Sequence, residues 1–120
     1  MNTPPRRMRF DDLPALEAAV STEFCDWGPS FRVTQELISA FARMTHDEFW
    51  LHVDPERAKR DSPTGTTLAH GFLVLSLVPA LQTPGPVEVT DFRRAFNAGL
   101  DRVRFVRPVA VEREIHARMR

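Results

Sequence analysis

The longest apolar run in this 120-residue chain is "LAHGFLVLSLVPAL", residues 68–81. A bilayer-spanning helix needs roughly 20 apolar residues, so this run is too short to cross a membrane. It is hydrophobic almost all round, which is typical of a helix that is buried on most sides. We therefore expect a core helix here, bent or ended near Pro79.

A second helix precedes this run. Thr34 stands in front of "QELISAFARM", where Leu37, Ile38, Phe41 and Met44 recur at helical spacing. This pattern predicts a helix with an N-cap threonine and one apolar face, ending near residues 44–46. Proline near a first turn also predicts two short helices, at 12–20 and 54–60, and residues 1–10 read as a loose arm.

After residue 86 the period of the pattern changes. In "RVRFVRPV" (102–109) and "EIHARMR" (114–120), apolar and polar residues alternate. Such alternation predicts two half-buried antiparallel strands. A core helix followed by strands with one apolar face indicates an α+β domain, with the sheet wrapped around the helix.

Composition excludes several classes. Sixteen basic and sixteen acidic residues cancel, whereas a nucleic-acid-binding protein usually carries a basic excess. Cys25 is the only cysteine, so it forms no internal disulfide and no cysteine-based zinc site. The first 20 residues hold no uninterrupted apolar segment typical of a secretory signal. We expect one cytoplasmic domain over residues 1–120, with no nucleic-acid or membrane partner.

The polar candidates gather between the two main helices. Asp47 and His52 lie five positions apart in "MTHDEFWLHVDP" (44–55), and "AHG" (69–71) opens the apolar run. An acid and an imidazole this close fit an acid–base pair, half a metal site or a solvated loop. The spacing of the candidate metal ligands matches no helix-borne ligand pair, so we expect no metal. The candidates in question are His46, Asp47, His52, Asp54 and His70.

Five segments together carry a resemblance: "VTQELISAFA", "DEFWLH", "HVDPERA", "AHGFLVLSL" and "GLDRVRF". Their combination resembles the MaoC-like dehydratases, and within them the NodN-like branch, which is related to (R)-specific enoyl-CoA hydratases. The likeness runs from about Cys25 to the C-terminus, with residues 1–24 left as an arm and a short helix. The linked pair, D-x4-H and then AHG, is more specific than either motif alone.

The resemblance implies a hot-dog fold, usually a homodimer, acting on enoyl-CoA thioesters without a cofactor. It assigns Asp47 and His52 as the acid–base pair, with the formal base left open, and the Gly71 N–H as oxyanion donor. His70 is then expected to hold the loop. Five arginines in the last part of the chain are expected mostly on a solvated strand face, with contact of one or two to CoA phosphates as the alternative: Arg93, Arg94, Arg102, Arg104 and Arg107.

Two loop positions and the C-terminus differ from the family pattern. His46 stands where the family has glycine, and Phe49 where it has an amide that orders the loop. Relatives continue through roughly three more strands after the one matching "EIHARMR". We therefore expect a shortened sheet that leaves the core helix partly uncovered. A non-catalytic acyl-thioester-binding relative and an acyl-CoA thioesterase are the alternatives.

Overall fold

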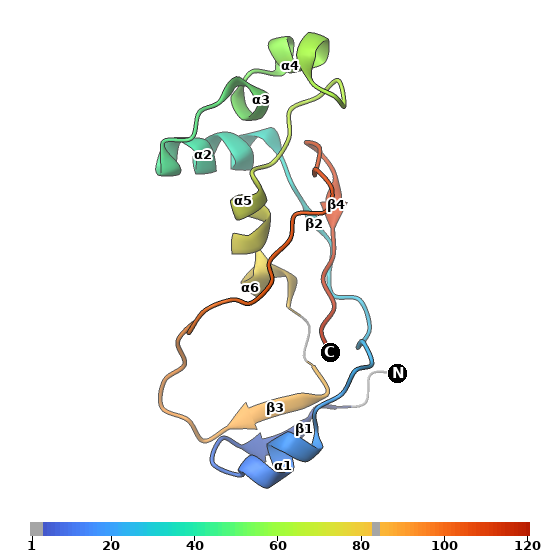
Figure 1. Cartoon of the computed structure of the whole chain (residues 1–120), viewed down its shortest axis with the longest axis vertical. Helices are drawn as coiled ribbons and strands as arrows, with labels where there is room; N and C mark the ends of the chain where they lie inside the picture. Colours follow the sequence, from blue (N-terminus) through green and yellow to red (C-terminus); the bar gives the residue numbers. More distant parts are fainter. Residues whose placement is uncertain (1–3, 83–84) are drawn as a thin grey trace. The chain divides into compact units, whose positions relative to one another are not determined.

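The computed structural model describes residues 4–82 and 85–120 (Figure 1). The chain divides into two compact units. One unit contains residues 30–81 and 104–116, and the other is assembled from residues 1–29, 82–103 and 117–120. The candidate catalytic, oxyanion-binding and metal-ligating residues all belong to the first of these, here called the site unit, whereas Arg93, Arg94 and Arg102 belong to the other.

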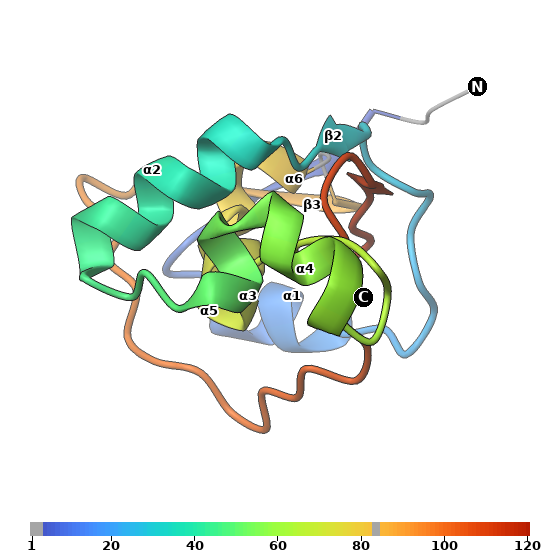
Figure 2. The same ribbon diagram turned by 90° about the horizontal axis from the view of Figure 1, so that it is seen from above.

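The site unit is mixed helix and sheet, as expected. Its elements in chain order are β2 (Phe31–Arg32), α2 (Gln35–Thr45), α3 (Trp50–Val53), α4 (Pro55–Asp61), α5 (Gly71–Ser76), α6 (Val78–Leu81) and β4 (Glu114–Ile115). Strands β2 and β4 pair antiparallel, with Phe31 opposite Ile115. Figure 2 shows α2, α3 and α4 following one another before the chain returns through a loop to α5.

Capping residues explain where the predicted helices begin. The Thr34 hydroxyl accepts a hydrogen bond from Leu37 N at 3.2 Å, and the Asp54 carboxylate accepts one from Arg57 N at 3.0 Å. Each cap provides an acceptor for a backbone N–H that has no partner within its helix. Pro55 begins α4, as predicted. The short helix α3 was not predicted, and Phe49 at its N-cap makes no side-chain capping bond.

Helix α2 ends at a strained residue. His46 follows Thr45 with φ 59° and ψ 25°, the left-handed conformation usual for glycine at this position. The apolar face predicted for α2 is real but shifted, since Ile38 and Ala42 are fully buried while Met44 is 72% exposed.

The apolar run forms two helices instead of one. Helix α5 ends at Ser76 and α6 begins at Val78, so the break comes just before Pro79, which has no N–H to continue the ladder. Only Leu73 and Leu81 are buried in these two helices, and Phe72 is 71% exposed. Burial on most sides is therefore wrong, whereas the expected uncovered face is present.

The core of the site unit lies where α5 meets α2. Val33, Ile38, Ala69 and Leu73 form its buried centre. Partly buried side chains surround them: Phe31, Leu37, Phe41, Val74, Leu77, Val109, Val111 and Ile115. The apolar run thus contributes to the core, and its neighbours come from both ends of the site unit.

The two predicted C-terminal strands are largely absent. Residues 102–109 form no strand, and the second predicted strand is reduced to β4. Val103 and Phe105, expected on a buried face, are 43% and 52% exposed. Alternation favours a strand only where another strand pairs with it. The nearest ladder contact is an isolated antiparallel bridge between Leu68 and Ala110, the residue that follows this segment.

The second unit contains α1 (Leu13–Ala18) and a parallel pair of strands, β1 (Arg6–Arg9) and β3 (Val87–Thr90). The described part of the predicted loose arm is therefore a strand, because β3 pairs with it; residues 1–3 lie outside the described residues. Helix α1 begins at Leu13, with Pro14 in its first turn as predicted. The Asp12 carboxylate caps it.

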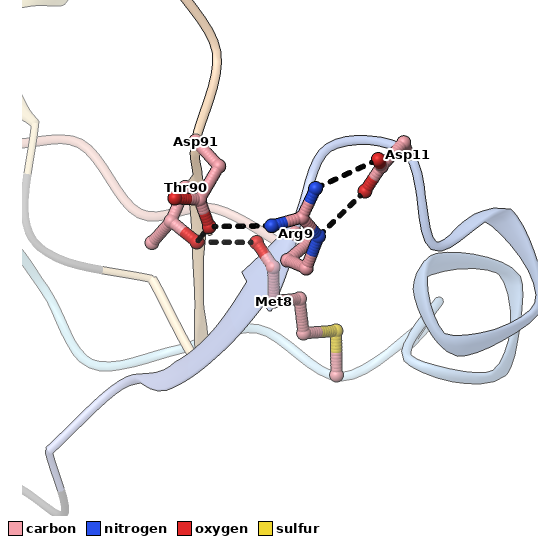
Figure 3. A network of polar contacts seen from close by, with 5 residues as sticks. All are labelled: Met8, Arg9, Asp11, Thr90 and Asp91. Atoms are coloured by element: carbon pink, nitrogen blue, oxygen red, sulfur yellow. Dashed lines mark hydrogen bonds and ion pairs between the residues drawn. The ribbon is translucent and has the colours of Figure 1, made fainter.

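Figure 3 shows the polar network beside this strand pair. Arg9 donates two hydrogen bonds to the Asp11 carboxylate, each 2.9 Å long, and the Thr90 hydroxyl donates to Met8 O. The Arg9 bonds hold the pKa of Asp11 below its ordinary value. Both side chains are solvent-exposed, so screening keeps the contribution to stability small.

No helix among the described residues is long and apolar enough to cross a membrane. This agrees with the length of the run at 68–81.

The strain at His46 gives a stability prediction. His46→Gly should raise the free energy of unfolding by about 1 kcal/mol, because glycine lacks the Cβ that disfavours the left-handed conformation. His46→Ala is the matched control, since it removes the imidazole but keeps the Cβ. Urea unfolding should rank His46→Gly above both other proteins; equal stability of the two variants would contradict the strain at this residue.

Candidate active site

His52 lies on the single turn of α3, and its ring is fixed by a backbone carbonyl. Its Nδ1 is 2.7 Å from Leu68 O. A carbonyl oxygen only accepts, so Nδ1 carries the proton and Nε2 keeps its lone pair. The same segment is joined again by the hydrogen bond from Leu68 N to Leu51 O at 3.0 Å. His52 therefore presents a single, defined basic nitrogen.

His70 is buried behind His52, at 4% exposed, and its ring stacks on the His52 ring with centroids 3.7 Å apart. Its Nε2 donates to Asp47 O at 2.9 Å. This agrees with the prediction that His70 holds the loop. Its Nδ1 is buried with no hydrogen-bond partner among the described residues.

Asp47 follows the left-handed turn at the end of α2. Its backbone N donates to Ala42 O at 3.0 Å, which ties the residue to the last turn of the helix. Its side chain is 57% exposed, and its Oδ2 lies 3.9 Å from the Nε2 of His70. The carboxylate is thus held beside the two imidazoles while remaining open to solvent.

The structure brings the predicted pair together. Asp47, His52 and His70 each offer one ligand-type atom, and these atoms lie within 4.8 Å of one another. His46 and Asp54 are not part of this cluster; Asp54 caps α4 instead. The sequence placed Asp47 and His52 on one loop, but a helical turn carries His52.

The same three residues could hold a metal ion, but the two rings are poorly arranged for it. The lone pair of an imidazole nitrogen lies in the ring plane, and a bound metal sits close to that plane. The His52 and His70 rings are stacked, with centroids 3.7 Å apart and planes only 23° from parallel, so a single ion cannot lie close to both ring planes. The His70 nitrogen that lies beside the Asp47 carboxylate, Nε2, donates to Asp47 O, so it has no lone pair for a metal in this arrangement.

Gly71 is the first residue of α5 and directly follows His70. Its N–H has no intrahelical acceptor, as is usual at this position, and no acceptor is found for it in residues 4–82 and 85–120. A Cβ at Gly71 would lie 2.9 Å from the ring of Phe105. A cavity of about 270 Å³ adjoins Gly71, and Phe105 and Arg107 line it.

Of the five arginines named from the sequence, Arg107 is the one that borders this cavity among the described residues. The other four are exposed in the segment from Asp91 to Arg104. Binding of CoA phosphates by any of them stays a prediction.

Two further residues contact the site and were missed. Gln35, the first residue of α2, donates from Nε2 to His52 O at 2.8 Å. Its Oε1 accepts a hydrogen bond from the Thr67 hydroxyl. Nothing in their spacing signals this contact, because Gln35 and Thr67 are 32 positions apart.

Comparison with known proteins places the chain in a family. Residues 20–120 match the model of the MaoC like domain. Nodulation protein N of Rhizobium leguminosarum bv. viciae is 45% identical over 86 residues, which cover 72% of this chain and 53% of that protein. The 3-hydroxyacyl-thioester dehydratase Z of Mycobacterium tuberculosis (strain ATCC 25618 / H37Rv) is 42% identical over 110 residues, covering 90% of this chain and 70% of that protein.

A solved structure agrees. The Monoamine oxidase regulatory protein from Archaeoglobus fulgius superposes with a TM-score of 0.62 at 34% identity, covering 85% of this chain and 66% of that one. The chain spans about half the length of Nodulation protein N. The predicted class, α+β with a hot-dog fold, is confirmed by this likeness and by the family match. On these grounds, together with the Asp47, His52 and AHG motifs that the site unit brings together, the chain belongs to the MaoC-like domain family.

Proposed function

We propose that the chain is a hydratase or dehydratase that adds water to, or removes it from, the double bond of an enoyl thioester. The observation that carries this is the cluster of Asp47 and His52 beside Gly71. Asp47 and His52 each offer a ligand-type atom within 4.8 Å of the other, and the hydrogen bond of Nδ1 to Leu68 O fixes the tautomer of His52. The free N–H of Gly71 directly follows His70, which stacks on His52.

Hydration needs an activated water and a place for negative charge. The water oxygen attacks the β-carbon while one of its protons passes to the His52 Nε2. Asp47 accepts the second hydrogen bond of the water and orients it. The electron pair of the double bond moves toward the thioester oxygen, where the Gly71 N–H stabilises the developing charge. His52 then delivers the proton that it took from water to the α-carbon, which completes the 3-hydroxyacyl product and returns His52 to its starting state; dehydration is the reverse.

One relative supports this reaction class by its name, 3-hydroxyacyl-thioester dehydratase Z, at 42% identity. Coenzyme A as the thioester carrier is our narrower proposal, as are a homodimer, a cytoplasmic location and catalysis without a cofactor. Phe49 and His46 do not remove the cluster, since Asp47 and His52 still lie together. This favours an enzyme over a non-catalytic relative.

The first test is hydration of crotonyl-CoA and longer enoyl-CoA esters, followed by loss of the enoyl absorbance. Asp47→Asn should lower kcat by about 100-fold or more, and Glu48→Gln, the neighbouring exposed acid, should not. His52→Asn should lower kcat similarly, because its amide can still donate to Leu68 O but cannot accept the proton. Folded wild-type protein with no turnover at any chain length would refute the proposal, and release of free thiol would indicate a thioesterase.

Gly71 can be tested separately from its packing. Gly71→Ala should reduce both stability and kcat, because its Cβ would meet the Phe105 ring 2.9 Å away. Combining it with Phe105→Ala removes that clash. We expect the double variant to regain stability but to keep a kcat about tenfold or more below that of Phe105→Ala alone, since the methyl still obstructs the oxyanion site. Recovery of both quantities would show that the glycine serves packing alone.

The arrangement of the two imidazoles predicts catalysis without a metal. Dialysis against a chelator should leave kcat unchanged, and elemental analysis of the active protein should find no stoichiometric transition metal. A loss of activity that one divalent metal restores would contradict this and would make the cluster of Asp47, His52 and His70 the site to examine.

A further inference from the structure

Gln35 makes contacts that no role in the chemistry above accounts for. Its side-chain amide lies between the turn that carries His52 and the segment that leads to Gly71. The Nε2 donates to His52 O at 2.8 Å and to Ser39 Oγ at 3.1 Å, while Oε1 accepts from Thr67. Both ends of the amide are therefore used, and on different elements.

The orientation of the amide follows from its partners. A backbone carbonyl cannot donate, so the NH2 group must face His52 O and the carbonyl must face the Thr67 hydroxyl. Thr67 is 1% exposed, so without Gln35 its hydroxyl would be buried with no such acceptor. The Thr67 O in turn accepts from Val111 N at 3.0 Å, which fixes this segment from its other side.

Gln35 and Leu68 both hold His52, at different atoms. His52 is held at its ring by Leu68 O and at its backbone by Gln35. With the bond from Leu68 N to Leu51 O, these contacts fix the direction of the side chain: Leu68 holds the ring and the preceding residue, and Gln35 holds the carbonyl on which the ring is mounted. A small misplacement of a catalytic group lowers the rate of the chemical step more than it weakens substrate binding.

We propose that Gln35, acting with Thr67, is the positioning residue for the His52 base: one amide fixes the His52 carbonyl and the Thr67 hydroxyl together. This rests on the proposed function of the site. It extends that function to a residue on α2 that touches no reacting atom.

Gln35→Met and Gln35→Glu are the informative variants. Gln35→Met keeps the size but loses all three side-chain hydrogen bonds, and we expect kcat to fall about 10–100-fold with KM changed less than about threefold. Gln35→Glu places a carboxylate oxygen against the His52 carbonyl at neutral pH, so it should be similarly impaired there. When protonated, the new carboxyl can donate to His52 O and accept from Thr67, which restores the arrangement of the amide.

Gln35→Glu should therefore gain activity relative to wild type as the pH is lowered from about 8 to 5. The pH–rate profile of wild type should lack this rise. The titratable groups near position 35 are His52 and, around an adjoining cavity of about 430 Å³, Glu56, Lys59 and Glu112. They are the same in both proteins, so the ratio of the two kcat values isolates the introduced carboxyl. A merely structural residue would not give this pH-dependent ratio in a protein that stays folded across the range.

Ser39→Ala is the matched control, because it removes only the contact of Gln35 within α2; its kcat should stay within about twofold of wild type. Thr67→Val should lower kcat and Thr67→Ser should restore it, which keeps the test open where Gln35 variants fold poorly. The hydrogen-bonded Nδ1 proton of His52, observed by NMR, should be sharp in wild type and broadened in Gln35→Met. This signal tests Gln35 even where wild type hydrates no thioester.

Unchanged kcat and an unchanged Nδ1 signal in folded Gln35→Met would overturn the proposal. So would a Gln35→Glu protein whose kcat ratio to wild type is the same at every pH.

Discussion

The hydrogen bond from the His52 Nδ1 to Leu68 O is the contact on which the rest of the site depends. It joins two segments 16 positions apart, and Leu68 N returns the bond to Leu51 O. This reciprocal pair places the AHG segment against α3. It also fixes which nitrogen of His52 carries the proton, and so decides which one can act as a base. Without it, neither the stack on His70 nor the nearness of Gly71 would follow.

Local sequence was sufficient for the features that depend on nearby residues. The Thr34 cap and the helix that begins at Pro55 were predicted because the residues that decide a helix start lie in its first turn. The pairing of Asp47 with His52 was predicted from their spacing and from a family resemblance. By contrast, the contacts of Gln35 with Thr67 and of His70 with Asp47 O depend on how α2 meets the segment before α5. No periodic pattern carries that information.

The segments whose structure was predicted wrongly have one thing in common. Their structure depends on whether another strand or a packing neighbour lies beside them. Residues 102–109 have the alternation of a strand but pair with none, the nearest bridge being at Ala110; Phe105 packs on Gly71 instead of entering a ladder. Residues 6–9 have little strand pattern, yet β3 pairs with them in register. The apolar run was expected to be buried because of its composition, but burial needs neighbours. Leu73 is enclosed by the core, whereas Phe72 meets the ring of Phe105 and otherwise stays exposed.

The hydrogen bonds of the two stacked imidazoles leave them different nitrogens. The Nε2–H of His70 is committed to Asp47 O, and its Nδ1 is enclosed without an acceptor among the described residues, so neither nitrogen is open to a substrate water. His52 is only half-buried, and its Nδ1–H is committed to Leu68 O, so Nε2 is the nitrogen left for such a water. The stack therefore joins two rings with separate tasks: His70 fixes the loop, and His52 is the proposed base.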